Sequence, residues 1–350
     1  AEKAYHWFRR AADKGDAEAI FYLGRLTLRG EGVAQDLSAG LELLEQAASA
    51  GSGTALNELG SMHARGEGVT RDLEKAFQFF IAAAENGDLR GQFNAANCYL
   101  TGAGVKANDE RAADLYKKAA DGGYAEAQYN LGTMLLDGRG VDKDEKQAFS
   151  WFSKAAQAGL APAQYEAAQS YRKGRGVAAD HAKARELYSL AARKNHPDAQ
   201  FSLGLMLAAG LGGGSPDPGE AARWYAAAVA NKHAGAAHNL AILQIKGAGV
   251  PQDLGSAREL LEYAISLGAD EAMFSLGLLF FSGGPGLARD VVSAAVYALL
   301  SIQHFPQGQG QKLLEAVLPE LSNAQKEKAQ ARSEAWTREP KTLAWLSKTA

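Results

Sequence analysis

The chain contains very little cysteine and proline. One cysteine, Cys98, and 9 prolines occur among its 350 residues. A single thiol cannot form an intramolecular disulfide or a cysteine-rich metal site, and the count leaves the redox compartment open. The longest apolar stretches fall well short of the roughly 18 residues that a membrane-spanning helix requires. The sequence therefore excludes a disulfide-stapled fold, a cysteine-rich zinc site and an integral membrane segment.

The chain also has no excess of charge of one sign. It carries 37 basic and 40 acidic residues, which give a formal net charge of −3, and its isoelectric point is about 6.2. Such a chain has no general attraction to the phosphates of nucleic acids or to anionic membrane surfaces. We therefore expect no nucleic-acid partner.

Alanine and glycine are abundant instead. The sequence contains 70 alanines and 39 glycines, and 47% of its residues are hydrophobic. Alanine is the strongest helix former, so this composition favours an all-α protein. The apolar content is sufficient for a core and excludes intrinsic disorder.

A glycine-rich loop motif recurs along the chain with a period of 36 residues. The motif reads GEGV, GEGV, GAGV, GRGV, GRGV and GAGV, beginning at Gly30, Gly66, Gly102, Gly138, Gly174 and Gly247. Two further copies, after Gly210 and from Gly283, are degraded and carry one extra residue each. A period of this length is typical of stacked repeats, in which each unit is one supersecondary element.

Each repeat has room for two helices, which the apolar spacing of the first repeat places at residues 16–29 and 37–50. The loop glycines stand where the chain reverses, which needs positive φ or close backbone approach. Small residues in the middle of the first helix, such as Gly24 and Gly132, predict close contact with the second helix of the same repeat, where the Ala-Ala pair is also small and the large aromatic pair fills the remaining gap. Residues suited to N-capping the second helix follow each loop: Asp36, Asp72, Asn108, Asp144, Asp180, Asp253 and Asp290.

The pattern divides the chain into four segments. Residues 1–15 form the second helix of an incomplete repeat, 16–305 form eight repeats, 306–337 form capping helices, and 338–350 form a tail. The tail contains Leu343, Trp345 and Leu346 and is either unpacked or a docking segment. The first residues already follow a helical pattern, with no initiator methionine or signal peptide, so we expect a processed or truncated N-terminus.

The residues of the fourth repeat, AEAQYNLGTMLLDGRGVDKDEKQAFSWFSKAAQAG from Ala125, resemble the Sel-one-like repeat family, a relative of the tetratricopeptide repeat. The resemblance covers about 300 of the 350 residues. It implies an all-α, right-handed α/α superhelical solenoid of about eight helix pairs with a C-terminal capping helix. It also implies a scaffold or adaptor for a partner protein or peptide, in a bacterial protein. We expect a periplasmic or secreted location, with the cytoplasm as the alternative.

Residues for catalysis are hard to find in this sequence. The seven histidines are scattered, without the spacing of metal ligands, and Cys98 has no indicated histidine partner. The glycine loops lack the lysine-serine pair and the preceding strand of a phosphate-binding loop. We therefore predict no enzyme activity, no cofactor and no metal. The alternative function is binding or hydrolysis of a small cell-wall-derived ligand in the groove that the concave face of such a solenoid forms.

One stripe of the first helices is the candidate partner-binding surface, because in a tetratricopeptide-like solenoid these helices line the concave face. Aromatic residues recur on it, and they are either framework or the floor of a groove. The resemblance implies that asparagines next to them can bind a peptide backbone, while exposed helix asparagines would look the same. Basic residues nearby suit an acidic or carboxylate partner, or form a solvated face. The predicted partner-binding residues are Phe21, Arg25, Phe93, Asn94, Asn97, Tyr129, Asn130, Tyr165, Gln169, Arg172, Phe201, His238, Asn239 and Phe274.

Overall fold

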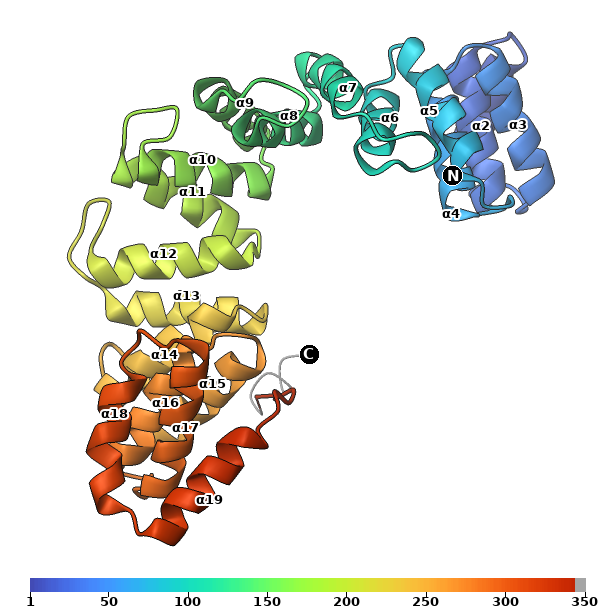
Figure 1. Ribbon diagram of the computed structural model, residues 1–350. Coiled ribbons are helices and arrows are strands. Elements are labelled where there is room, and N and C mark those ends of the chain that lie inside the picture. Colours follow the sequence, from blue (N-terminus) through green and yellow to red (C-terminus); the bar gives the residue numbers. More distant parts are fainter. Residues whose placement is uncertain (344–350) are drawn as a thin grey trace. The chain divides into compact units, whose positions relative to one another are not determined.

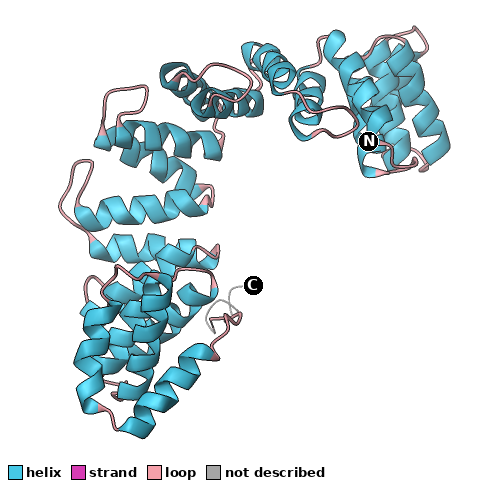
Figure 2. Cartoon of the chain, viewed as in Figure 1, coloured by secondary structure: helices cyan, strands magenta, loops and turns pink. Residues whose placement is uncertain are grey.

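The computed structural model of the chain is all-helical (Figure 1). It describes residues 1–343, which form nineteen α-helices and one 3-10 helix. Loops join the helices (Figure 2). Strand-like pairing within the described residues is confined to an isolated bridge between Gly284 and Leu287. The prediction of an all-α fold built from successive helix pairs is confirmed.

The helices alternate between a first and a second member of each pair, which we name helix A and helix B. The A helices are α2 (Ala17–Arg29), α4 (Gly53–Arg65), α6 (Leu89–Thr101), α8 (Ala125–Asp137), α10 (Ala161–Lys173), α12 (Pro197–Ala209), α14 (Ala234–Lys246) and α16 (Glu271–Ser282). The B helices are α3 (Leu37–Ser49), α5 (Leu73–Glu85), α7 (Asp109–Asp121), α9 (Glu145–Gln157), α11 (His181–Arg193), α13 (Pro218–Ala230), α15 (Leu254–Ser266) and α17 (Val291–His304).

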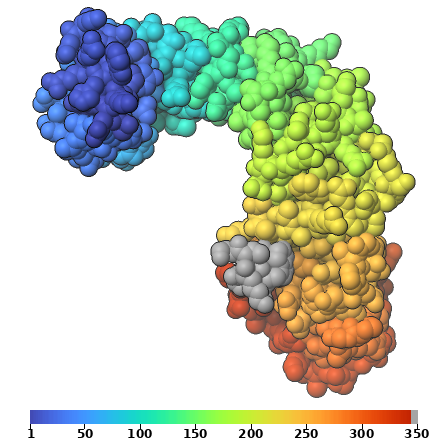
Figure 3. Space-filling view, turned by 180° about the vertical axis from the view of Figure 1, so that it is seen from behind, coloured from blue at the N-terminus to red at the C-terminus, as the bar shows by residue number. Residues whose placement is uncertain are grey.

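Three further α-helices flank the eight pairs. Helix α1 (Glu2–Ala12) precedes them, and α18 (Gly310–Val317), the 3-10 helix Leu318–Glu320 and α19 (Asn323–Glu334) follow them. The chain divides into two compact units, residues 1–170 with 174–178, and residues 171–173 with 179–350. In the second unit α17 packs against both α18 and α19. The red surface of the last helices borders the orange surface of the preceding repeats in Figure 3.

Side-chain caps fix the start of every B helix from α3 to α17. In each case a carboxylate or amide oxygen of the N-cap residue accepts a hydrogen bond from a backbone N–H in the first turn. Such a cap stabilises a helix by about 1 kcal/mol. The predicted caps are confirmed, and Asp217 adds one at the degraded loop: Asp36, Asp72, Asn108, Asp144, Asp180, Asp217, Asp253 and Asp290.

The two glycines of each loop have different roles. Gly138 is the C-cap of α8 and adopts φ 70°, which is the left-handed conformation that favours glycine. Gly140 also has positive φ, 68°. In addition, a Cβ at Gly140 would overlap the carbonyl oxygen of Asp109, at the start of helix B in the preceding repeat. Gly104 and Gly176 meet the backbone of Leu73 and Glu145 in the same way. In these three loops the second glycine therefore allows successive repeats to touch through their main chains.

In the middle of three A helices, at Gly60, Gly132 and Gly204, a glycine accepts an aromatic ring of helix B, whereas Gly24 faces the backbone of Gly40 and two leucines. A Cβ at Gly132 would lie 2.7 Å from Cε1 of Phe152, and one at Gly204 would lie 2.6 Å from Cε1 of Tyr225. The close approach of helix A to helix B, with the aromatic pair filling the gap, agrees with the prediction, but the atoms nearest to Gly132 and Gly204 belong to the aromatic pair rather than to the Ala-Ala pair. The alanine pair instead meets the next repeat, where Ala83 faces Gly91 of α6.

Candidate functional site

We call the predicted stripe on the A helices the helix-A face. Its aromatic position is not uniformly accessible: the Phe21 side chain is only 1% exposed, and Asn57 is also buried. Phe21 is therefore a core residue, with the Arg25 guanidinium carbon 5.6 Å from its ring centroid. The residues that occupy the equivalent position in the other repeats are half-buried: Phe93, Tyr129, Tyr165, Phe201, His238 and Phe274.

The half-buried rings rest on aromatic residues of helix B and of the following turn. The Phe93 ring centroid lies 5.7 Å from that of Tyr116 and 5.2 Å from that of Tyr124. In the second unit, Phe201 stacks on His233 with 4.3 Å between the ring centroids. These contacts are offset or tilted, as aromatic pairs prefer. Each ring is thus held in place from one side while part of it stays in contact with solvent.

Polar side chains connect neighbouring A helices. The amide Nδ2 of Asn94 on α6 donates to Oδ1 of Asn57 on α4 at 2.8 Å. The His238 Nε2 on α14 lies at the same distance, 2.8 Å, from the Ser275 hydroxyl on α16. Both bonds join residues 37 positions apart. The Asn94 amide, predicted to hold a peptide backbone, is therefore engaged between two repeats.

The phenol of Tyr116 on α7 organises two further predicted residues. Its hydroxyl donates to Oδ1 of Asn97 at 2.5 Å and also bonds the side chain of Asn130. Burial raises the pKa of Tyr116 to about 12, against the lowering effect of the Asn130 bond, so the phenol stays protonated and able to donate. Two asparagines from successive A helices thus converge on one buried hydroxyl.

The other predicted polar residues are more peripheral. Nε2 of Gln169 donates to the Tyr165 hydroxyl at 2.6 Å. Asn239 Nδ2 lies 3.5 Å from the Tyr225 hydroxyl, at the outer limit for a hydrogen bond. Arg172 is exposed at the end of α10. The structure thus distributes the predicted set over several A helices and gathers Phe93, Asn97 and Asn130 around the common partner Tyr116.

The helix-A face changes character between the two units, which the sequence analysis missed. One turn beyond the aromatic position, the first unit carries Arg25, Ser61, Asn97, Thr133 and Gln169, whereas the second carries Leu205, Ile242 and Leu278. Leu205 and Leu278 are 41% and 44% exposed. Beside Leu278 lies a hollow of about 300 Å³, with walls formed by Ile242, Ile245, Leu254, Leu279 and Pro285. Aligning the repeats at the position four residues after the aromatic one would have revealed this change from polar to apolar residues.

The ionisable groups of the described residues offer neither a metal site nor an activated thiol. In residues 1–343, no three His, Cys, Asp or Glu side chains come together as potential metal ligands. Burial raises the pKa of the Cys98 thiol to about 11, which keeps it protonated and a poor nucleophile at neutral pH. No helix in this part of the chain combines the length and the apolar character needed to cross a membrane.

Comparisons with known proteins agree with the repeat pattern. The family model of the Sel1 repeat matches nine segments: residues 1–16, 17–52, 53–88, 89–124, 125–160, 161–196, 197–233, 234–268 and 270–303. A search of the curated proteins finds no match. Among solved structures, the chain is similar to a protective antigen of uropathogenic Escherichia coli, with 26% identity and a TM-score of 0.56 over 94% of this chain and 85% of that one.

A second similar structure is a Sel1 repeat protein from Oxalobacter formigenes. It shares 27% identity with a TM-score of 0.61, over 70% of this chain and 96% of that one. Both similarities extend over most of the repeats, and both structures come from bacteria.

Proposed function

The chain belongs to the Sel1 repeat family, and from that premise we propose that it is a non-enzymatic scaffold that binds a partner protein or peptide on its helix-A face. Sel1 repeats build a scaffold that typically serves protein–protein interaction. A repeat surface offers a row of similar positions to an elongated partner rather than one enclosed site.

The observation that carries this proposal is the pair of exposed leucines on the helix-A face of the second unit. Leu205 lies on α12 and Leu278 lies on α16, and both side chains are more than two-fifths exposed. The hollow of about 300 Å³ beside Leu278 can receive one apolar side chain. An exposed leucine beside a pocket, with a second exposed leucine at the equivalent position two repeats earlier, favours a binding site for an elongated polypeptide with apolar anchors.

In the first unit, the same face offers aromatic and polar groups. We propose that Phe93, Tyr129 and Tyr165 contact a partner through their accessible edges. The amides of Asn94 and Asn130 already bond Asn57 and Tyr116. Their predicted role in holding a peptide backbone therefore depends on their carbonyl oxygens or on exchange of these bonds.

The test measures partner affinity for matched leucine variants. The partner is captured on the immobilised chain, purified, and titrated by calorimetry. Leu205→Ser with Leu278→Ser should weaken binding at least tenfold, about 1.4 kcal/mol. Leu190→Ser is the matched control, because Leu190 is 40% exposed on α11, a B helix. Equal losses in both variants, or full binding by the folded double variant, would move the site away from the helix-A face of the second unit.

The first unit is tested with Tyr129→Ala and Tyr165→Ala together. Truncation of aromatic anchors in an interface typically costs 2 kcal/mol or more, about thirtyfold in affinity. Glu186→Ala, an exposed change on helix B, should have almost no effect. Circular dichroism of each variant separates lost binding from unfolding.

We further propose that the protein works in a bacterial envelope, in the periplasm or after secretion. The bacterial origin of both similar structures supports a bacterial protein, and the description of one of them as a protective antigen favours an envelope or secreted location. Fractionation of cells that express the gene with its native upstream sequence tests it, and recovery with the cytoplasmic fraction would refute it.

A further inference from the structure

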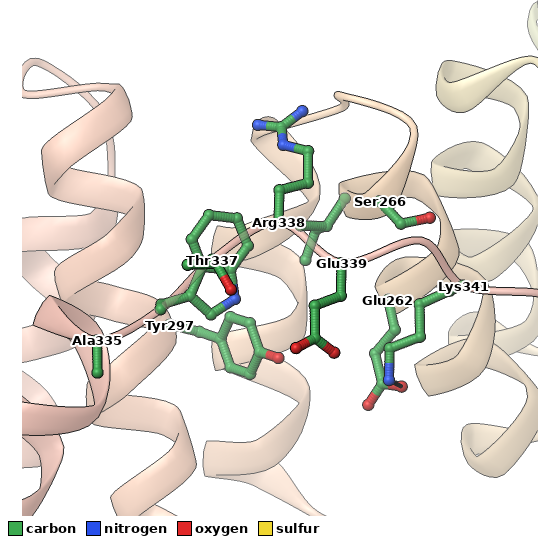
Figure 4. Close-up of a pocket in the computed structure, with 10 residues that line it drawn as sticks. Glu262, Ser266, Tyr297, Ala335, Thr337, Arg338, Glu339 and Lys341 are labelled. Atoms are coloured by element: carbon green, nitrogen blue, oxygen red, sulfur yellow. Dashed lines mark ion pairs between the residues drawn. The ribbon is translucent and has the colours of Figure 1, made fainter.

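The end of the chain lies against the second unit. After α19, residues 335–343 leave the helical path and cross toward α15 and α17, as the ribbon from Ala335 to Lys341 shows in Figure 4. Leu343 is only 3% exposed. We call residues 337–343, TREPKTL, the C-terminal segment. It has no regular secondary structure, yet specific groups of the helices hold it.

Arg338 is held at the turn before α16. Its guanidinium pairs with the carboxylate of Asp270, which also lies 2.9 Å from Nδ1 of His304. A Cβ at Gly268 would lie 3.0 Å from Nη1 of Arg338, and Gly268 has φ +102°. Glycine at this turn therefore leaves room for the guanidinium. A carboxylate, a bare backbone turn and an imidazole together form a site shaped for an arginine.

Asp270 differs from equivalent acidic residues elsewhere in the chain. Asp16 and Asp88 also precede A helices, and their side chains accept hydrogen bonds from backbone N–H groups of the first turn. Asp270 precedes α16 but makes no side-chain cap. Its carboxylate is directed to His304 and Arg338 instead. The turn before α16 is thus adapted for contact with the C-terminal segment rather than for starting a helix.

A second ion pair fixes the position of the segment. Nζ of Lys341 lies 3.7 Å from Oε2 of Glu262 on α15. Arg338 and Lys341 are three residues apart, and buried Leu343 follows two residues later. Two cations at a fixed spacing, each opposite a carboxylate, define both the direction and the register of the bound segment.

The C-terminal segment does not fill the surface on which it lies. A hollow of about 310 Å³ remains between the segment and the helices, and its lining includes Ile265, Tyr297 and Trp336 together with Glu262, Arg338 and Lys341. Side chains of Tyr297 and Glu339 border this hollow in Figure 4. A segment with bulkier side chains than Thr337 and Glu339 would therefore fit better than the chain's own.

We propose that α15, α17 and the turn at residues 267–270 form a second docking surface, which binds a partner segment of the chemistry Arg-x-x-Lys-x-Leu, and that the C-terminal segment is its intramolecular occupant. The partner is a basic, otherwise uncharged or apolar polypeptide segment without helical structure. It binds by displacing residues 337–343. This surface is formed by B helices and is independent of the helix-A face.

The energetics are compatible with displacement. The side chains of both ion pairs are partly exposed, between 22% and 51%, so each pair contributes modestly. Residues 335–336 join the C-terminal segment to α19. This covalent connection gives the segment an effective concentration in roughly the millimolar range, which is typical of short flexible linkers. A partner must therefore exceed the affinity of the C-terminal segment, and removal of that segment's charges should expose the surface.

The test uses the full chain and a fluorescent synthetic peptide, TREPKTL, as the probe. The variant Arg338→Glu with Lys341→Glu should bind the peptide at least tenfold more tightly than the wild-type chain does, because its own segment no longer competes. Adding Asp270→Asn and Glu262→Gln should remove that gain, whereas adding Glu259→Gln, an exposed change on α15, should not. Leu205→Ser with Leu278→Ser should leave peptide binding unchanged, which separates this surface from the helix-A face.

Equal peptide binding by the wild-type chain and the charge-reversed variant would overturn the proposal and leave the segment as a structural cap. Hydrogen exchange on the wild-type chain gives a second measurement, which does not depend on how the variants fold. Saturating peptide should accelerate exchange in residues 337–343 at least threefold without changing α15 or α17. Unchanged exchange in the presence of the peptide would equally refute the proposal.

Discussion

The A helices of the two units begin with different capping chemistry. In the first unit Asp16, Ser52 and Asp88 cap α2, α4 and α6 through side-chain oxygens. In the second unit, imidazoles take that position: Nδ1 of His196 accepts from the Ala199 N–H at 3.3 Å, and Nδ1 of His233 accepts from the Ala236 N–H at 3.1 Å. These N-cap hydrogen bonds occupy equivalent positions in the repeats, but the bonds to imidazole are lost at a higher pH than the bonds to oxygen.

A carboxylate or hydroxyl oxygen remains an acceptor in mildly acidic solution, whereas an imidazole nitrogen loses its acceptor function once it is protonated. Burial lowers the pKa of His196 and of His233, and the nearby Asp198 carboxylate opposes this effect. The folded state thus binds these protons less readily than the unfolded state does. Acid sensitivity should consequently be concentrated in the second unit, even though both units share one repeat pattern.

The largest expected effect comes from a destabilising substitution in the first unit, and it shows whether the second unit is affected as well. Gly140→Val adds a side chain at positive φ and against the backbone of Asp109, and should reduce the free energy of unfolding by roughly 2–4 kcal/mol. Gly138→Val meets only the conformational penalty, about 1–2 kcal/mol. Urea unfolding measures both variants. The Gly138 and Gly140 double variant should lose at least as much as Gly140→Val alone.

Hydrogen exchange locates that damage. Because repeats contact only their neighbours, protection should fall around α7 to α9 and stay unchanged in the second unit. Uniform loss of protection from residue 16 to 305, or identical stability of the two single variants, would contradict this expectation.

The next effect concerns pH. A group whose pKa is lowered by folding stabilises the protein fully above its ordinary pKa, near 6.5 for histidine, and this contribution is lost as the pH falls below that value. Between pH 7.5 and 5.5 the second unit should lose about 1–2 kcal/mol, corresponding to two N-caps. Exchange rates of α12 and α14 at the two pH values report the loss. His196→Asp with His233→Asp should abolish it, and equal acid sensitivity of α4 and α6 would break the comparison.

A smaller effect compares two buried phenols. Tyr116→Phe removes the hydroxyl that bonds Asn97 and Asn130 and leaves both amides without that partner, so we expect a loss of about 1 kcal/mol. Tyr225→Phe in the second unit removes only a contact of 3.5 Å with Asn239 and should be close to neutral. Thermal melts of both variants give the difference, and a larger loss for Tyr225→Phe would reverse the expected order.

The smallest effect lies on the helix-A face. Because Leu205 and Leu278 are largely solvent-exposed, Leu205→Ser and Leu278→Ser should each change stability by less than about 0.5 kcal/mol. A loss above that range in chemical denaturation would identify these leucines as packing residues.

The sequence predicted contacts that recur in each repeat. The period located α2 and α3 within a residue of their observed bounds, and the aspartates after the loops cap the B helices, because a repeated pattern reports local geometry.

The imidazole caps were not predicted, because histidine at that position carries no distinctive capping signal. The Asn94 bond to Asn57 and the Arg338 pair with Asp270 were also missed. They join residues 37 and 68 positions apart, and their formation depends on side-chain packing.

The main-chain contact at the second loop glycine affects how such a chain can evolve. Gly104, Gly140 and Gly176 each meet a backbone segment of the preceding repeat, so this junction does not depend on which side chains the neighbour carries. A duplicated or deleted repeat therefore recreates the same junction without compensating substitutions. Gene segments that encode one period can be added or removed in frame, while the exposed positions of each copy diverge independently.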